Sequence, residues 1–108
     1  MSGLLRINHA AVWFGFSIDT VRRLSTAGVI PTVHYGKQRR YSLEALQTAF
    51  GTKGPLLRSG KVAAMLGLAT QTVNRLAGEG KIPAIDFGSK KLRRFRREDV
   101  ERIAVEGY

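Results

Sequence analysis

The sequence repeats itself after 52 residues, and this repeat restricts the folds that the chain can adopt. Two additional residues enter the second copy before Arg39-Arg40-Tyr41 matches Arg93-Arg94-Phe95. Most matched residues are glycine, proline or apolar, the types that fix turns and cores, so we predict two copies of one small structural unit. The 52-residue shift aligns Leu4-Leu5-Arg6 with Leu56-Leu57-Arg58, Gly15 with Gly67, Thr20-Val21 with Thr72-Val73, Arg23-Leu24 with Arg75-Leu76, Gly28 with Gly80, Ile30-Pro31 with Ile82-Pro83 and Gly36 with Gly88.

Each copy is predicted to run helix, turn, helix, hairpin, helix. In the first copy, a short helix is expected from Asn8 to Phe14, with Ala11, Val12 and Phe14 facing inward. Gly15 then suits the positive φ that ends such a helix.

A second helix is expected to follow at once. Ser17 is a favourable N-cap, and Val21 and Leu24 mark its buried stripe. Gly28 is expected to end it. The charged side chains off the stripe are Asp19, Arg22 and Arg23.

A hairpin and a third helix complete the copy. Residues 32–35 and 39–41 are β-prone and flank a turn at Gly36-Lys37-Gln38. Ser42 then caps a helix that carries Leu43, Leu46 and Phe50.

The second copy follows the same plan. Strands are expected at residues 84–87 and 92–95 around a turn at 88–91, and a last helix at 97–103. Since Ala69 stands where a capping residue is wanted, we expect Thr70 to cap the second helix and delay its start by one residue. The fold class is therefore mainly α with small β-hairpin wings. The expected domains are residues 1–51 and 56–108, joined by a linker at 52–55.

Charge indicates the kind of partner. Eighteen Lys and Arg against eight Asp and Glu give a net charge of +10. The first 54 residues hold seven basic and two acidic residues, and the remainder holds eleven and six. A field of this size attracts polyanions, and either half alone could engage phosphate.

Several classes of protein are disfavoured. The absence of cysteine excludes a disulfide framework, a thiolate zinc site and a cysteine nucleophile. His9 and His34 fall in different predicted elements, so we expect no enzyme, metal site or cofactor. No apolar run is long enough to span a membrane, and the N-terminus lacks a signal-peptide layout, so a cytoplasmic, nucleoid-associated protein is expected. Trp13 is expected in the core or between the units.

These motifs together resemble a known family. Residues 15–24, then Gly28-Val29-Ile30-Pro31, Gly36 and Arg39-Arg40-Tyr41, are similar to the winged helix-turn-helix of MerR-type regulators and phage excisionases. Residues 66–68, 72–76, 80–83, 93–95 and 99–100 are similar to the same family. The resemblance implies two tandem winged helix-turn-helix units that bind double-stranded DNA.

The resemblance also implies the site residues. Recognition helices are expected at 17–26 and 69–78, with basic wings beside them. Arg23 and Arg75 are expected near phosphates. The candidates expected near base edges are Asp19, Thr20, Arg22, Gln71, Thr72 and Asn74. The candidates on the recognition helices are Ser17, Asp19, Thr20, Arg22, Arg23, Thr70, Gln71, Thr72, Asn74 and Arg75. The candidates on the wings are Lys37, Arg39, Arg40, Lys90, Lys91, Arg93 and Arg94, of which one in each arginine pair is expected to face inward.

Because the two predicted recognition helices differ in sequence, we expect a bipartite DNA site with unlike halves, bound by a small transcriptional regulator. The residues do not separate this role from that of an excisionase, which binds and bends DNA beside an integrase. RNA polymerase or integrase is the corresponding protein partner, and self-association along DNA is a further expectation. An RNA-binding function is disfavoured because the sequence has no patterned aromatic platform for stacked bases. A module that recruits another protein is the other alternative.

Overall fold

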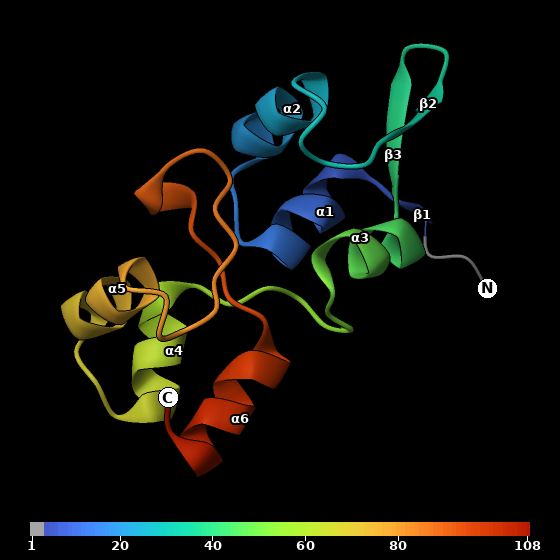
Figure 1. The fold of residues 1–108 in the computed structure, drawn as a ribbon. Helices are drawn as coiled ribbons and strands as arrows, with labels where there is room; N and C mark the ends of the chain where they lie inside the picture. Colours follow the sequence, from blue (N-terminus) through green and yellow to red (C-terminus); the bar gives the residue numbers. More distant parts are fainter. Residues whose placement is uncertain (1–3) are drawn as a thin grey trace. The chain divides into compact units, whose positions relative to one another are not determined.

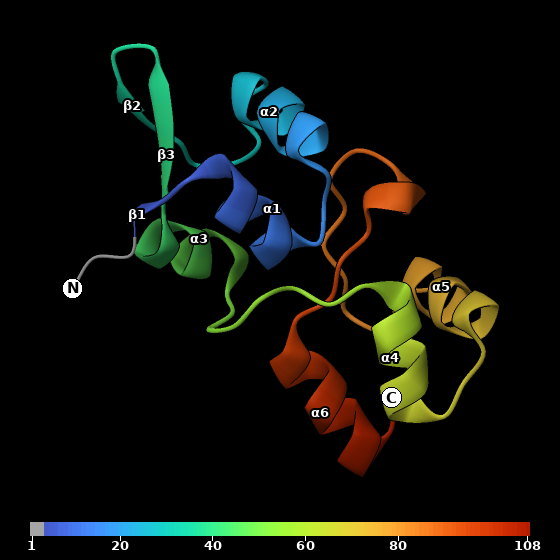
Figure 2. The ribbon, with the colours of Figure 1, turned by 180° about the vertical axis from the view of Figure 1, so that it is seen from behind.

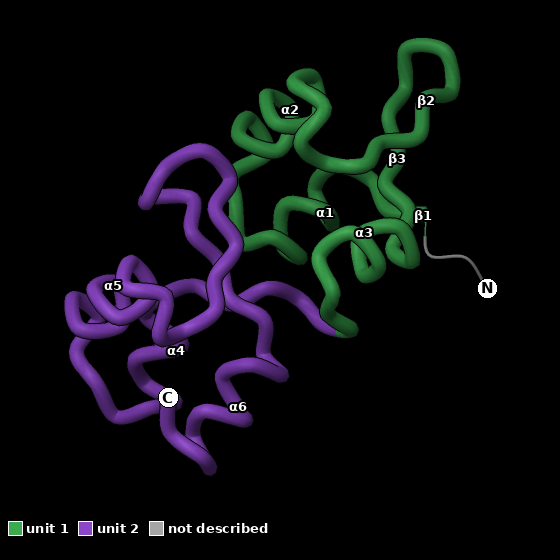
Figure 3. The backbone as a smooth tube through the Cα atoms, in the orientation of Figure 1, with its two compact units in different colours: residues 1–53 green, residues 54–108 purple. Residues whose placement is uncertain are grey.

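The computed structural model describes residues 4–108 and divides the chain into two compact units, Met1–Lys53 (unit 1) and Gly54–Tyr108 (unit 2) (Figure 3). Residues 1–3, with which the first expected domain begins, lie outside the described residues. The described part contains six α-helices, one 3₁₀ helix and a three-stranded antiparallel sheet. The predicted fold class, mainly α with a small β component, is confirmed at this level.

Unit 1 combines three helices with the sheet, whose strand order is β1-β3-β2 (Figure 1). Strand β1 was not predicted; it consists of two residues that pair with the end of β3, far along the chain. The elements are β1 Leu4–Leu5, α1 Ile7–Phe14, α2 Ile18–Thr26, β2 Val33–Tyr35, β3 Gln38–Ser42 and α3 Leu43–Phe50.

The core of unit 1 is aromatic. The Phe14 ring meets Trp13 and Phe50 edge-on, at centroid distances of 4.9 and 5.4 Å. Trp13 is buried, as the sequence predicted for a core residue. The inward prediction for Val12 is wrong, since its side chain is 76% exposed. Residues 10, 11, 13 and 14 form the buried face instead, and a helical period of 3.6 turns Val12 away from them.

Capping residues fix the helix starts in unit 1 as predicted. The Ser17 hydroxyl accepts a hydrogen bond from the Thr20 backbone N–H at 3.1 Å. The Ser42 hydroxyl accepts one from the Ala45 N–H at 3.2 Å. Gly15 ends α1 in the left-handed region, at φ 74°. The short α1–α2 turn therefore follows from local chemistry.

Unit 2 places α4 (Ser59–Leu66) between α5 (Thr70–Gly78) and α6 (Arg97–Glu106) (Figure 2). The predicted Thr70 cap is wrong, because α5 begins at Thr70 and Ala69 holds the N-cap position without a side-chain hydrogen bond. The turn that starts at Gly67, with φ 68°, sets the helix start irrespective of the capping side chain. The core comprises Leu57, Val62, Ala63, Val73, Leu76, Ile82, Phe95, Val100 and Ile103.

The prediction of a regular hairpin in the second copy is wrong. Pairing is reduced to isolated bridges between Ile85 and Arg94 and between Leu57 and Phe95. The two additional residues lengthen the connection, which closes into the 3₁₀ helix η1 (Lys90–Leu92) instead of a tight hairpin turn. We call residues 33–42 wing 1 and residues 85–94 wing 2.

Candidate nucleic-acid interface

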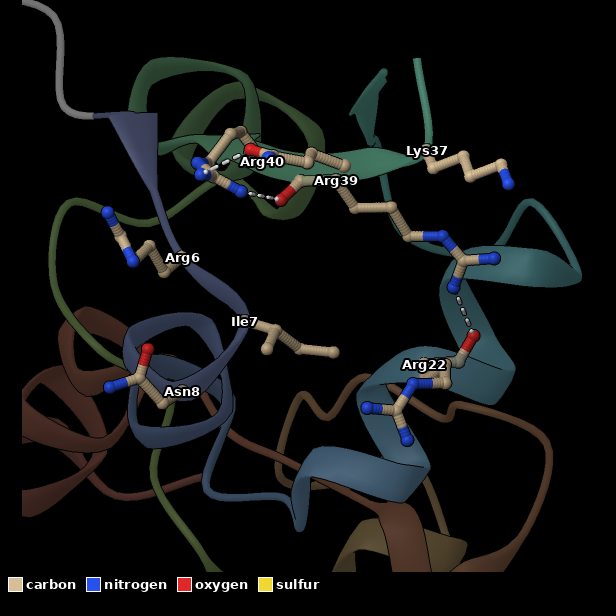
Figure 4. A pocket seen from close by; sticks show the side chains of 8 residues that line it. Arg6, Ile7, Asn8, Arg22, Lys37, Arg39 and Arg40 are labelled. Carbon is tan, nitrogen blue, oxygen red and sulfur yellow. Dashed lines mark hydrogen bonds between the residues drawn. The ribbon is translucent and has the colours of Figure 1, made fainter. Parts of the chain in front are cut away.

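Unit 1 has an open groove between the start of α1, helix α2 and wing 1 (Figure 4). Its volume is about 650 Å³. Five of its eight lining residues are cationic and none is a carboxylate, so the groove is suited to a polyanion. This first groove is lined by Arg6, Ile7, Asn8, Arg22, Lys37, Gln38, Arg39 and Arg40.

The two arginines of wing 1 are held in place by hydrogen bonds to uncharged oxygens. Figure 4 shows Arg39 reaching across to α2, where its Nη1 donates to the Arg22 carbonyl at 3.4 Å. Arg40 donates to the Arg39 carbonyl at 2.8 Å and to the Gln38 side-chain oxygen at 2.9 Å. Since these partners are neutral, both guanidinium charges contribute fully to the field of the groove.

Helix α2 presents its charged side chains outward, as expected. Arg22 pairs with Asp19 at 2.9 Å, with side chains 55% and 87% exposed. Such an exposed pair is weak, so Arg22 can exchange Asp19 for a nucleic-acid partner at small cost. Arg23 is exposed and donates to the Thr20 hydroxyl at 3.2 Å. Thr20, expected near bases, is instead buried and also bonded to the Ser17 hydroxyl.

Unit 2 has a groove in the equivalent place, between α5 and wing 2, with a volume of about 520 Å³. Arg75, Lys90 and Lys91 are exposed there, and Arg75 pairs with Glu79 at 3.3 Å. The site therefore also offers accessible cations beside the second helix of a helix pair. This second groove is lined by Asn74, Arg75, Gly78, Lys90, Lys91 and Arg93.

Both arginines of wing 2 are buried, whereas only one of the pair was expected to face inward. Arg93 donates to the Asn74 carbonyl at 2.9 Å and to the Asp86 carboxylate at 3.2 Å. Arg94 donates to the Arg93 carbonyl at 2.8 Å. Burial and the nearby Arg58 charge lower the pKa of Arg94 to about 10, so it stays protonated at neutral pH. The bond from Arg93 to Asn74 braces wing 2 against α5.

The remaining candidates on α5 are divided between surface and interior. Thr70 and Gln71 are exposed, whereas Thr72 and Asn74 are half-buried. The Ser59 hydroxyl donates to the Asn74 side-chain oxygen at 2.8 Å. The sequence analysis did not identify Ser59 as a hydrogen-bond partner of Asn74, or Arg6 as a residue of the first groove. The signal for Arg6 was its recurrence as Arg58, at the N-cap of each first helix.

Other kinds of site find little support in the part of the chain that the structure describes. No group of three or more His, Asp or Glu side chains within residues 4–108 could hold a metal ion. Over the same residues, every helix is too short or too polar to cross a lipid bilayer.

A family model for a helix-turn-helix domain matches residues 56–104, which include α4, α5, η1 and most of α6. No curated protein and no solved structure matches the chain significantly. The match supports a DNA-binding helix-turn-helix in unit 2, with α4 and α5 as its helix pair and double-stranded DNA as its ligand. Domains of this family are generally not enzymes.

Proposed function

We propose that the chain binds double-stranded DNA sequence-specifically through both units and acts as a small transcriptional regulator. The observation that carries this proposal is the cationic groove between the second helix and the wing in each unit. A second helix of this kind fits the major groove of B-DNA, and a basic wing beside it neutralises backbone phosphates.

The proposal includes unit 1 because its contacts recur in unit 2, to which the family match belongs. In each unit the first wing arginine donates to a carbonyl of the second helix, and the next arginine donates to the carbonyl before it. We infer tandem winged helix-turn-helix domains of the MerR or excisionase type, at residues 1–51 and 56–108. The recurring strand contacts are Leu5 with Tyr41 and Leu57 with Phe95, and Val33 with Arg40 and Ile85 with Arg94.

The exposed and groove-lining side chains divide by chemistry. Arginine suits guanine and amides suit base edges, so Asp19 and Arg22 of α2, with Gln71 and Asn74 of α5, are assigned to bases. Cations on flexible stems suit phosphates. The residues assigned to phosphates are Arg6, Arg23, Lys37, Arg39 and Arg40 in unit 1 and Arg75, Lys90 and Lys91 in unit 2.

The DNA site is then bipartite with unlike halves. Helix α2 presents Asp19 and Arg22, whereas α5 presents Gln71 and Asn74 at the equivalent places, so the two units read different bases. The short connection between the units makes the second contact intramolecular once the first has formed. A single chain can therefore occupy both half-sites.

Selection from a randomised duplex library, followed by gel shift, tests this function. We expect a motif with two different halves, and loss of discrimination in only one half for Arg22→Ala. A motif with one short half, or no enrichment over the starting library, would contradict the proposal.

An excisionase role is the second candidate, favoured by the resemblance of residues 15–24, 66–68 and 72–76 to that family. It uses the same DNA contacts and adds bending beside an integrase. A circular-permutation gel assay separates the two roles, since strong bending together with stimulation of excision by a neighbouring integrase supports the excisionase.

A further inference from the structure

Asn74 is held at two of its atoms. Its side-chain oxygen accepts a hydrogen bond from the Ser59 hydroxyl at 2.8 Å, and its main-chain oxygen accepts one from Arg93 at 2.9 Å. Its amide Nδ2 forms no hydrogen bond to any residue in the described range 4–108. Because Asn74 lines the second groove, the amide is fixed with its donor atom available to a ligand there.

Arg93 is itself immobilised. Its side chain is only 7% exposed, and its Nε donates to Asp86 at 3.2 Å while its Nη1 holds Asn74. The Asp86 carboxylate balances its charge, so Arg93 adds little to the attraction of phosphate. Its position suits it to hold α5 and wing 2 together.

Unit 1 lacks this arrangement. Ile7 stands where unit 2 has Ser59, and Arg22 stands where unit 2 has Asn74. An isoleucine side chain cannot donate a hydrogen bond, and Arg22 pairs with Asp19 instead. The fixed amide is therefore a property of unit 2.

We propose that Ser59 and Arg93 are positioning residues that orient the Asn74 amide so that α5 reads a hydrogen-bond acceptor in the major groove. Guanine N7 and O6, thymine O4 and adenine N7 are such acceptors, whereas cytosine presents only a donor. Bidentate pairing with adenine needs the amide oxygen as well as the nitrogen, and the Ser59 hydrogen bond already occupies one of the two acceptor positions of that oxygen. This inference rests on the proposed DNA binding and specifies the kind of base in the half-site that unit 2 binds.

The test measures base preference of the full chain at every position of its selected duplex, for wild type, Ser59→Ala, Arg93→Lys and Asn74→Ala. Asn74→Ala should remove a discrimination of about tenfold against cytosine at one position. Ser59→Ala should shift that position towards adenine several-fold, because the amide is free to turn. Arg93→Lys keeps the charge but cannot form both bonds, so it should flatten the preference there.

Two controls make the result decisive. Lys91→Ala should weaken all sequences alike, and Arg39→Lys should leave the second half-site unchanged. The positioning role is overturned if Ser59→Ala and Arg93→Lys both have the same base preferences as wild type. It is also overturned if both weaken binding to every sequence equally, as Lys91→Ala does. DNA binding itself stands in either case. If wild type binds no duplex, both proposals fail.

Discussion

Salt dependence reports directly on the grooves. Eight cations are assigned to phosphates, five in unit 1 and three in unit 2. If roughly six to eight of them contact phosphates, each contributing about −0.9 to the log–log slope, affinity falls by about 10³ to 10⁴ between 50 and 200 mM salt. Removing Lys90 and Lys91 together should flatten the slope by about 2, so that about tenfold less affinity is lost over the same range.

Fluorescence anisotropy with a labelled duplex at four salt concentrations measures this slope for wild type and for the Lys90→Ala/Lys91→Ala variant. The matched control is Arg97→Ala/Arg102→Ala, which removes the same charge from exposed positions on α6 that line neither groove. An equal flattening of the slope by this control, or a nearly salt-independent wild type, would refute the assignment of the grooves to phosphate.

Three predictions concern stability and are checked by thermal and urea unfolding. Tyr41→Phe should stabilise unit 1 by about 1 kcal/mol, because the buried hydroxyl has no hydrogen-bond partner within the described residues. The reverse change at the equivalent position, Phe95→Tyr, should destabilise unit 2 by about 1–3 kcal/mol. Changes in the free energy of unfolding with the same sign in both variants would contradict this. Ser17→Ala should cost about 1 kcal/mol through loss of the α2 cap, and an unchanged midpoint would count against that role. Gly67→Ala should cost about 1–2 kcal/mol because φ is 68°, whereas Gly78→Ala, inside α5 with open space around it, should be neutral or stabilising by about 0.5 kcal/mol; the opposite order would show the turn geometry to be wrong.

Local chemistry made much of unit 1 predictable. Ser17 and Ser42 cap the next turn of their own helices, and Gly15 supplies the positive φ of the α1–α2 turn. These interactions span only a few residues, so a single sequence contains them in full. The outward face of α2 followed from the period of its apolar residues.

Features that depend on distant contacts were not predictable in the same way. Arg93 is buried because a carbonyl 19 residues earlier and Asp86 both accept its hydrogen bonds, while charge alone favours a surface position. Val12 turned outward because the buried face also includes Ala10, which is too small to mark a face by hydrophobicity and was not among the residues expected inward. Thr20 is buried and bonded to the exposed side chains of Ser17 and Arg23, contacts that the apolar period of α2 does not indicate.

A hydroxyl-radical footprint of the full chain on its selected duplex tests most directly whether both units contact DNA. Arg23 and Arg75 occupy equivalent places, 52 residues apart and both exposed, so their alanine variants form a matched pair. Wild type should protect two neighbouring stretches of unlike sequence, with Arg23→Ala opening one and Arg75→Ala opening the other. One protected stretch in wild type, or loss of the same stretch in both variants, would contradict DNA binding by two units.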